Sequence, residues 1–131
     1  MVCLDTNFLI DLIKKKQEAL SKLRSLNSTG MRLSTTTITA SELYAGAFQS
    51  KYTKQGLAEV NAILDTLRLL TLTRDSAEIY GVTNAHLQSI GKKSQDLDML
   101  IASIVMASTE TLLTKNTEDF ENIKELKIET W

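Results

Sequence analysis

Acidic residues at separated positions carry the strongest chemical signal in this sequence. Asp5 directly follows a short apolar run, and Asn116 and Asp119 come just after another one. Glu42 and Asp98 each stand near the start of a helical pattern. Carboxylates that gather in one place repel one another, and their pKa values rise unless a cation offsets the repulsion. Oxygen ligands of this kind suit a hard divalent cation such as Mg²⁺, which takes one or two carboxylates and keeps several waters.

The elements that must position these acids alternate along the chain. Short apolar runs predict strands at residues 2–4, 31–34, 69–73, 111–114 and 126–128. Helical spacing predicts helices at residues 8–13, 19–26, 40–45, 57–67, 75–90 and 97–106. This alternation indicates an α/β fold with a mostly parallel, about five-stranded sheet and helices on both faces. Ligands of such sheets bind outside the carboxyl ends of the strands, where the acids are expected.

Several local interactions follow from the same patterns. Thr39 is predicted as a helix N-cap, with Glu42 at the spacing of a capping box. In the helix that Asp75 opens and Gly91 closes, the pattern predicts one inward-facing side, made of Ile79, Val82, His86, Leu87 and Ile90. His86 is expected to pack there without a catalytic role.

Cys3, and Tyr44 together with Phe48, are expected to take part in packing. Cys3 is expected to be a small core residue of the first strand. Tyr44 and Phe48, at helical spacing, are expected on a packed or partner-facing helix.

Composition narrows the classes of protein. The chain has 131 residues, a net charge of −1, one cysteine and one histidine, and is interpreted as a single domain over residues 1–131. One cysteine excludes an internal disulfide framework, and one histidine disfavours a His-rich metal site or a Ser-His-Asp triad. The sequence has no apolar run near the ~20 residues of a membrane span and no visible secretory signal. A cytoplasmic protein with no membrane partner is therefore expected.

Four segments, in order, resemble the signature segments of PIN-domain ribonucleases, and most closely the VapC toxins of toxin–antitoxin pairs. The segments are residues 4–7 (LDTN), 38–46 (ITASELYAG), 98–102 (DMLIA) and 113–120 (LTKNTEDF). The ending LKIETW also resembles the last strand and terminal Trp of the family. The resemblance covers the whole chain and implies a three-layer α/β/α sandwich.

The resemblance implies a Mg²⁺- or Mn²⁺-dependent endoribonuclease. Asp5 corresponds to the first acid of the family, Glu42 to the second and Asp98 to the third. The fourth position falls either on Asn116, where many members have Asp, or on Asp119. Asp5 and Asp98 would bind a first ion, Glu42 would help orient a water, and a second ion would lie near Asn116 and Asp119.

Other residues are expected around this site. Thr6, Asn7 and Thr114 would hold the carboxylates in place, and Asp96 is a weaker candidate that a plain helix cap also explains. Lysines at 14–16 and at 92–93 are candidate phosphate contacts, although solvated surface is the more common role of such runs.

The resemblance also implies partners: an RNA substrate, a second copy in a homodimer, and a small VapB-like antitoxin. The antitoxin is expected to insert a basic side chain, such as Arg, among Asp5, Glu42 and Asp98, because a guanidinium pairs carboxylates bidentately.

Other hypotheses about the function have less support. One is a catalytically weak or inactive PIN-fold protein that binds RNA or protein, and Asn116 in place of an acid leaves this hypothesis open. A receiver-like domain or an aspartyl-phosphate phosphatase needs further acids that Leu4, Asn7 and residues 71–73 do not supply.

Overall fold

A five-stranded parallel sheet forms the centre of the protein. The computed structural model describes residues 1–92 and 95–131. The strands lie in the order β3-β2-β1-β4-β5, and every neighbouring pair is parallel, so the predicted sheet is confirmed. Their bounds are β1 (Val2–Leu4), β2 (Leu33–Thr36), β3 (Arg68–Leu70), β4 (Thr111–Leu113) and β5 (Lys127–Glu129).

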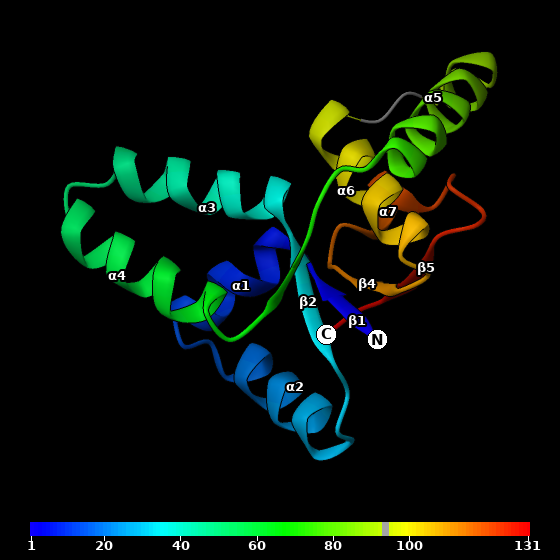
Figure 1. The fold of residues 1–131 in the computed structure, drawn as a ribbon. Helices are drawn as coiled ribbons and strands as arrows, with labels where there is room; N and C mark the ends of the chain where they lie inside the picture. Colours follow the sequence, from blue (N-terminus) through cyan, green and yellow to red (C-terminus); the bar gives the residue numbers. More distant parts are fainter. Residues whose placement is uncertain (93–94) are drawn as a thin grey trace.

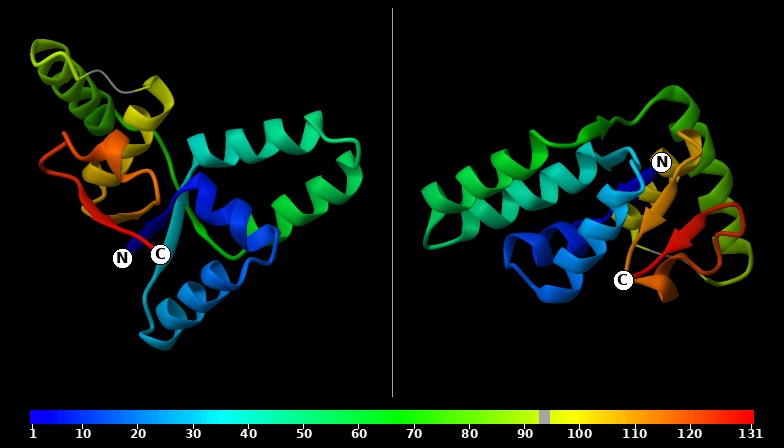
Figure 2. Two further views of the ribbon diagram at one scale, coloured as in Figure 1. Left: turned by 180° about the vertical axis from the view of Figure 1, so that it is seen from behind. Right: turned by 90° about the horizontal axis from the view of Figure 1, so that it is seen from below.

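Helices cover the sheet in three layers, and the path of the chain can be followed in Figure 1. Their bounds are α1 (Thr6–Ile13), α2 (Gln17–Ser28), α3 (Thr37–Gln49), α4 (Thr53–Leu64), α5 (Arg74–Ser89), α6 (Asp96–Ala107) and α7 (Thr117–Phe120). Helices α1 to α4 lie on one side of the central strands and α5 to α7 on the other, as the two views of Figure 2 agree. The predicted α/β/α sandwich is thereby confirmed.

The alternation of side chains along β1 divides the core. Val2 and Leu4 pack into a cluster with α1–α4, whereas Cys3 packs into a second cluster with α6. Successive side chains of a strand point to opposite faces, so the three buried residues of β1 contribute side chains to the clusters on both sides of the sheet. Helix α6 packs into the second cluster from Met99 to Val105, as its nearly continuous apolar sequence predicts, whereas Leu97 in its first turn is 49% exposed.

The C-terminal residue closes the first half of the core. The ring of Trp131 packs edge-on against Phe8 with the ring centroids 4.8 Å apart. The ammonium nitrogen of Lys115 lies 4.9 Å from the Trp131 ring centroid. These contacts fasten the end of the chain beside α1.

The start of α3 differs from the sequence prediction. Thr36, rather than Thr39, is the N-cap, and its hydroxyl oxygen accepts a 3.0 Å hydrogen bond from the Thr39 backbone N–H. Thr39 therefore lies inside the first turn and is fully buried. The predicted Thr39–Glu42 capping box is wrong, because the preceding threonine already occupies the extended cap position.

The packing of α5 also differs from the prediction. Ser76 and Leu87 are its buried residues, whereas the side chain of Val82 is 67% exposed and His86 and Ile90 are exposed. The prediction that His86 packs inward is wrong. Helix α5 packs mainly against α6, and its far end projects from the rest of the molecule in Figure 1, so few of its residues are buried.

One property bears on membranes. In the part of the chain that the structure describes, no helix combines the length and the apolarity needed to cross a bilayer.

Candidate active site

Asp5 lies at the carboxyl end of the central strand and is held from two sides. It is the N-cap of α1, and its Oδ1 accepts a 2.8 Å hydrogen bond from the Thr6 backbone N–H. Its Oδ2 accepts a 2.7 Å hydrogen bond from the Thr114 hydroxyl, which follows β4. Burial raises the pKa of Asp5, although these two hydrogen bonds lower it. The side chain is thus a fixed, poorly solvated carboxylate, and the capping role and the site role coincide.

Glu42 is joined to the same edge through Thr6. The Thr6 hydroxyl donates a 2.7 Å hydrogen bond to Glu42 Oε1, linking α1 to α3. The Thr6 and Thr39 hydroxyl oxygens are also within hydrogen-bonding distance, at 3.1 Å. Glu42 is therefore turned toward Asp5's end of the sheet and takes no part in capping its own helix.

Asp98 lies in the first turn of α6, and the charges of the other acids affect its pKa. Its pKa is raised to about 6, first by partial burial and then by the negative charges of Asp5, Asp119 and Glu42. Charges separated by a wide, solvated gap are screened and leave little effect on a pKa. The structure therefore brings four of the acids selected from the sequence into one electrostatic cluster: Asp5, Glu42, Asp98 and Asp119.

The turn after β4 presents the two candidates for the fourth position. The Asn116 backbone N–H donates a 3.0 Å hydrogen bond to the Thr114 hydroxyl oxygen. The Asp119 N–H in turn donates to the Asn116 carbonyl at 3.1 Å. Thr114 is fully buried and connects this turn to Asp5. Asn116 is uncharged, whereas the negative charge of Asp119 helps to raise the pKa of Asp98.

Two further predicted residues, Asp96 and Asn7, are exposed. Asp96 accepts a 3.2 Å hydrogen bond from the Tyr80 hydroxyl of α5. It is two positions from Asp98 on the same helix, so the two side chains leave the helix in different directions. Asn7 is exposed on α1.

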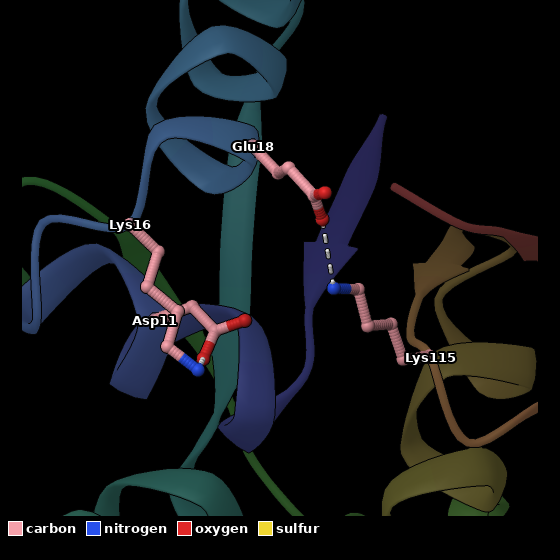
Figure 3. Close-up of polar contacts among 4 residues, drawn as sticks. All are labelled: Asp11, Lys16, Glu18 and Lys115. Carbon is pink, nitrogen blue, oxygen red and sulfur yellow. Dashed lines mark hydrogen bonds and ion pairs between the residues drawn. The ribbon is translucent and has the colours of Figure 1, made fainter.

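The lysines predicted to contact phosphates differ in their surroundings. Lys16 forms an ion pair with Asp11 at 3.4 Å, as Figure 3 shows. Lys14, Lys15 and Lys92 are exposed, and Lys93 falls outside the described residues. Lys115 stands between Thr114 and Asn116 and pairs with Glu18 at 3.3 Å (Figure 3).

Sequence reasoning missed one contact of the site. Thr39, first interpreted as a cap, is buried beside Thr6 and one turn before Glu42. The available signal was the i, i+3 spacing of Thr39 and Glu42, which places both on one face of a helix as well as in a capping box.

The donor atoms fit a hard divalent cation. The acidic cluster offers carboxylate oxygens, which are ligands that Mg²⁺ and Mn²⁺ prefer. Within residues 1–92 and 95–131, no three or more His, Cys, Asp or Glu side chains lie close enough together to hold a metal ion as a group. Mg²⁺ is usually bound through one or two carboxylates and keeps several of its waters, so a pair of these acids is the set that would hold it.

Comparisons with known proteins identify the family of the chain. The PIN domain family matches residues 2–126. Ribonuclease VapC2 of Haemophilus influenzae is 30% identical over 128 residues, which cover 98% of this chain and 96% of that protein. The tRNA(fMet)-specific endonuclease VapC of Salmonella typhimurium is 32% identical over the same shares of the two chains.

Solved structures give the same result for the fold. A chain of VapBC2 from Rickettsia felis, bound to a DNA fragment from the promoter, superposes with a TM-score of 0.92 at 27% identity. The match covers 100% of this chain and 99% of that one. DNA-bound VapBC from Salmonella typhimurium gives a TM-score of 0.90 at 31% identity, over 99% and 97% of the two chains. With the fold, the order of the acidic segments and the full-length match in agreement, this chain belongs to the PIN domain family.

Proposed function

We propose that this protein is a VapC-type toxin, a divalent-metal-dependent endoribonuclease that a cognate antitoxin inhibits. The observation that carries the proposal is the gathering of acids at one edge of the sheet, where Thr6 hydrogen-bonds to both Asp5 and Glu42. The pKa of Asp98 is raised there, first by partial burial and then by the charges of Asp5, Asp119 and Glu42. Like charges held together in a partly buried site need a cationic ligand to offset their repulsion. The relatives named as ribonucleases extend over nearly the whole chain.

Each acid has a role that follows from its surroundings. Asp5, fixed by Thr6 and Thr114, and Asp98, at the start of a rigid core helix, would hold the ion. Glu42, oriented by the Thr6 hydroxyl, would orient the attacking water and accept its proton. Asp119 is favoured over Asn116 as the fourth acid, because its charge already acts on Asp98.

The reaction would be hydrolysis of an RNA phosphodiester bond. A bound Mg²⁺ or Mn²⁺ ion supplies charge stabilisation at the phosphate and lowers the pKa of water. Glu42 would position that water for attack on phosphorus in line with the departing 3′ oxygen. No histidine or cysteine is needed, in agreement with the exposed His86 and the fully buried Cys3.

The acidic cluster also supports the proposed partners. An antitoxin that inserts an Arg side chain would replace the cation among Asp5, Glu42 and Asp98 with a bidentate partner. Several solved relatives are VapBC complexes, in which the toxin is paired with its antitoxin. A homodimer and a cytoplasmic location complete the proposal.

The test combines metal binding with RNA cleavage. Calorimetry with MnCl₂ and cleavage of total RNA in MgCl₂ would compare the wild type with Asp98→Asn. Asp96→Asn is the matched control, because it removes the same charge two positions away, where the side chain bonds Tyr80. Loss of binding and cleavage in Asp98→Asn, with both kept in Asp96→Asn, is the expected result.

The same experiment separates the alternative class. An RNA-binding module that no longer cuts, which Asn116 in place of an acid leaves open, would bind RNA and leave it intact in every variant. Equal cleavage by the wild type and Asp98→Asn would contradict the assigned site.

A further inference from the structure

The tip of the α3–α4 hairpin presents two large aromatic rings to solvent. Phe48, near the end of α3, is 64% exposed, and Tyr52, just before α4, is 73% exposed. Among the large hydrophobic residues exposed in the described chain, these are the two aromatic ones. The hairpin projects away from the sheet in both views of Figure 2, so the tip lies far from the core.

Positive charge accompanies the rings. A shallow hollow at the tip is lined by Lys51, Tyr52, Thr53, Lys54, Gln55 and Ala58, a set without an acidic residue. The ion pairs formed within residues 1–92 and 95–131 use other lysines, namely Lys16, Lys22 and Lys115. Lys51 and Lys54 therefore keep their charge available to an anionic ligand.

The hairpin that carries this tip is stiff. A Cβ atom at Gly56 would lie only 3.3 Å from the Cβ of Ala47, so the two helices pack closely at that point. The Tyr44 hydroxyl donates a hydrogen bond to Asn61 Oδ1 across the same pair of helices. Rings presented on a rigid support lose little conformational freedom when a ligand stacks on them.

The connecting turn is fixed as well. The Tyr52 N–H donates a 3.1 Å hydrogen bond to the Ser50 hydroxyl oxygen. The Thr53 hydroxyl donates to the Ser50 carbonyl at 2.9 Å. The exposure of Tyr52 is therefore a property of an ordered turn.

The tip is connected to the acidic cluster by a single helix. Glu42 and Phe48 are both on α3, and the rise of 1.5 Å per residue separates them by about 9 Å along its axis. A strand bound at the acidic cluster needs to extend only along the outer part of α3 to reach the tip. The cluster itself repels phosphates, so most of the affinity for a polyanion must come from elsewhere on the protein.

We propose that the hairpin tip is a second RNA-binding site, which holds a single-stranded segment beside the segment being cut. Bases would stack on Phe48 and Tyr52, and Lys51 and Lys54 would bind the flanking phosphates. Exposed aromatic rings interleaved with lysines form the usual sequence-tolerant platform for single strands. The inference rests on the proposed function, because that function makes RNA the ligand.

Fluorescence anisotropy in EDTA would measure this binding without cleavage. The probe is a fluorescein-labelled oligouridylate of about 20 nucleotides, long enough to cover both sites. The Phe48→Ala/Tyr52→Ala double variant is expected to bind about tenfold or more weakly, since each stacked base contributes strongly. The matched control is Val82→Ala/Ile90→Ala, which removes two exposed apolar side chains from α5 and should leave the affinity unchanged.

The lysines give a separate readout. Lys51→Gln/Lys54→Gln should weaken binding and reduce the slope of log affinity against log salt by about 1.4, since each phosphate contact to a single strand contributes about 0.7. Wild-type affinity and slope in both tip variants would overturn the proposal, as would a wild type that does not bind the probe. Tip variants that keep RNA affinity but lose an antitoxin would instead assign the tip to a protein partner.

The design keeps the two proposals distinguishable. If the wild type cuts RNA in MgCl₂ and the tip variants bind the probe normally, the second site is wrong and the ribonuclease stands. If the wild type cuts nothing but the tip variants lose the probe, the ribonuclease is wrong and the binding site stands.

Discussion

The hydroxyl of Thr6 donates a 2.7 Å hydrogen bond to Glu42 Oε1 and joins the first turn of α1 to α3. Its backbone N–H meanwhile donates to Oδ1 of Asp5 at 2.8 Å. A single residue thus orients two of the four acids. The side chain that determines the position of Glu42 comes from a part of the chain 36 positions away.

Thr6→Val keeps the shape of this side chain and removes its hydroxyl. Glu42 would lose its orienting partner, and RNA cleavage should fall about 10- to 100-fold, the usual effect of removing a group that orients a metal-site ligand. Measurement of kcat under saturating MgCl₂ checks this. Thr6→Ser restores the hydroxyl and should recover most of the activity; a serine variant as slow as the valine one would contradict the role of the hydrogen bond.

Asp98 gives the metal-free protein a defined pH dependence. Its pKa is about 6 in the folded state, against an ordinary value of 3.8, so the folded protein binds this proton more tightly than the unfolded chain does. The metal-free folded state should therefore lose stability as the pH rises from about 4 to about 6, with no further change from this group above that range. Thermal unfolding in EDTA across this range measures the loss.

The control for this pH dependence is Asp98→Asn, in which the loss of melting temperature over that range should become smaller. Added MnCl₂ should restore stability most above pH 6, where Asp98 is ionised and no proton competes with the ion. A wild type and Asp98→Asn with parallel melting profiles would contradict the assignment.

Asp5→Asn should remove the charge of this side chain and keep its role as the helix cap. The Asn side-chain oxygen can still accept the capping hydrogen bond from the Thr6 N–H, so the fold should persist. Cleavage should be lost, and the pKa of Asp98 should fall toward its ordinary value, because the charge of Asp5 helps to raise it. A carboxyl NMR titration measures this pKa.

Asp96→Asn is the comparison variant for that titration, since the charge of Asp96 is not among the causes of the Asp98 shift. An Asp98 pKa that stays near 6 in Asp5→Asn would show that the two carboxylates do not interact.

Thr114→Val should destabilise the protein. The Thr114 hydroxyl is fully buried, donates to Asp5 Oδ2 at 2.7 Å and accepts from the Asn116 N–H at 3.0 Å. The valine leaves a carboxylate oxygen and an N–H without this partner, at a cost of roughly 2–3 kcal/mol in the free energy of unfolding. Urea unfolding provides the value, with Thr114→Ser as the variant that should lie near the wild type.

Much of the architecture was predictable from local sequence. Short apolar runs separated by helical patterns predicted a parallel sheet, because parallel neighbours require crossover connections, and the five strands pair in this way. The continuous apolar stretch of α6 predicted a core helix, since a helix without a polar face is stable only when buried. Asp5 followed from its place at the end of the first strand, where the structure puts it.

Interactions between distant segments could not be derived in this way. The i, i+3 spacing of Thr39 and Glu42 fits a capping box and a shared helical face equally well. The structure decides between them, because Thr36 caps α3 and the Thr6 hydroxyl contacts both residues. In α5, apolar spacing predicted a buried face, but the extent of burial depends on which neighbour covers the helix.

The sequence by itself therefore determined the element types, their order and the residue types of the acidic cluster, because these depend on hydrophobic periodicity and on side-chain chemistry. The tertiary structure alone decided the central place of β1 and the contact of Thr6 with Glu42. It also placed Asp96 in a hydrogen bond with Tyr80 and brought Asp98 within reach of the charges of the other acids. The physical reason is that electrostatic coupling and hydrogen bonding depend on distances in space, which local patterns along the chain do not specify.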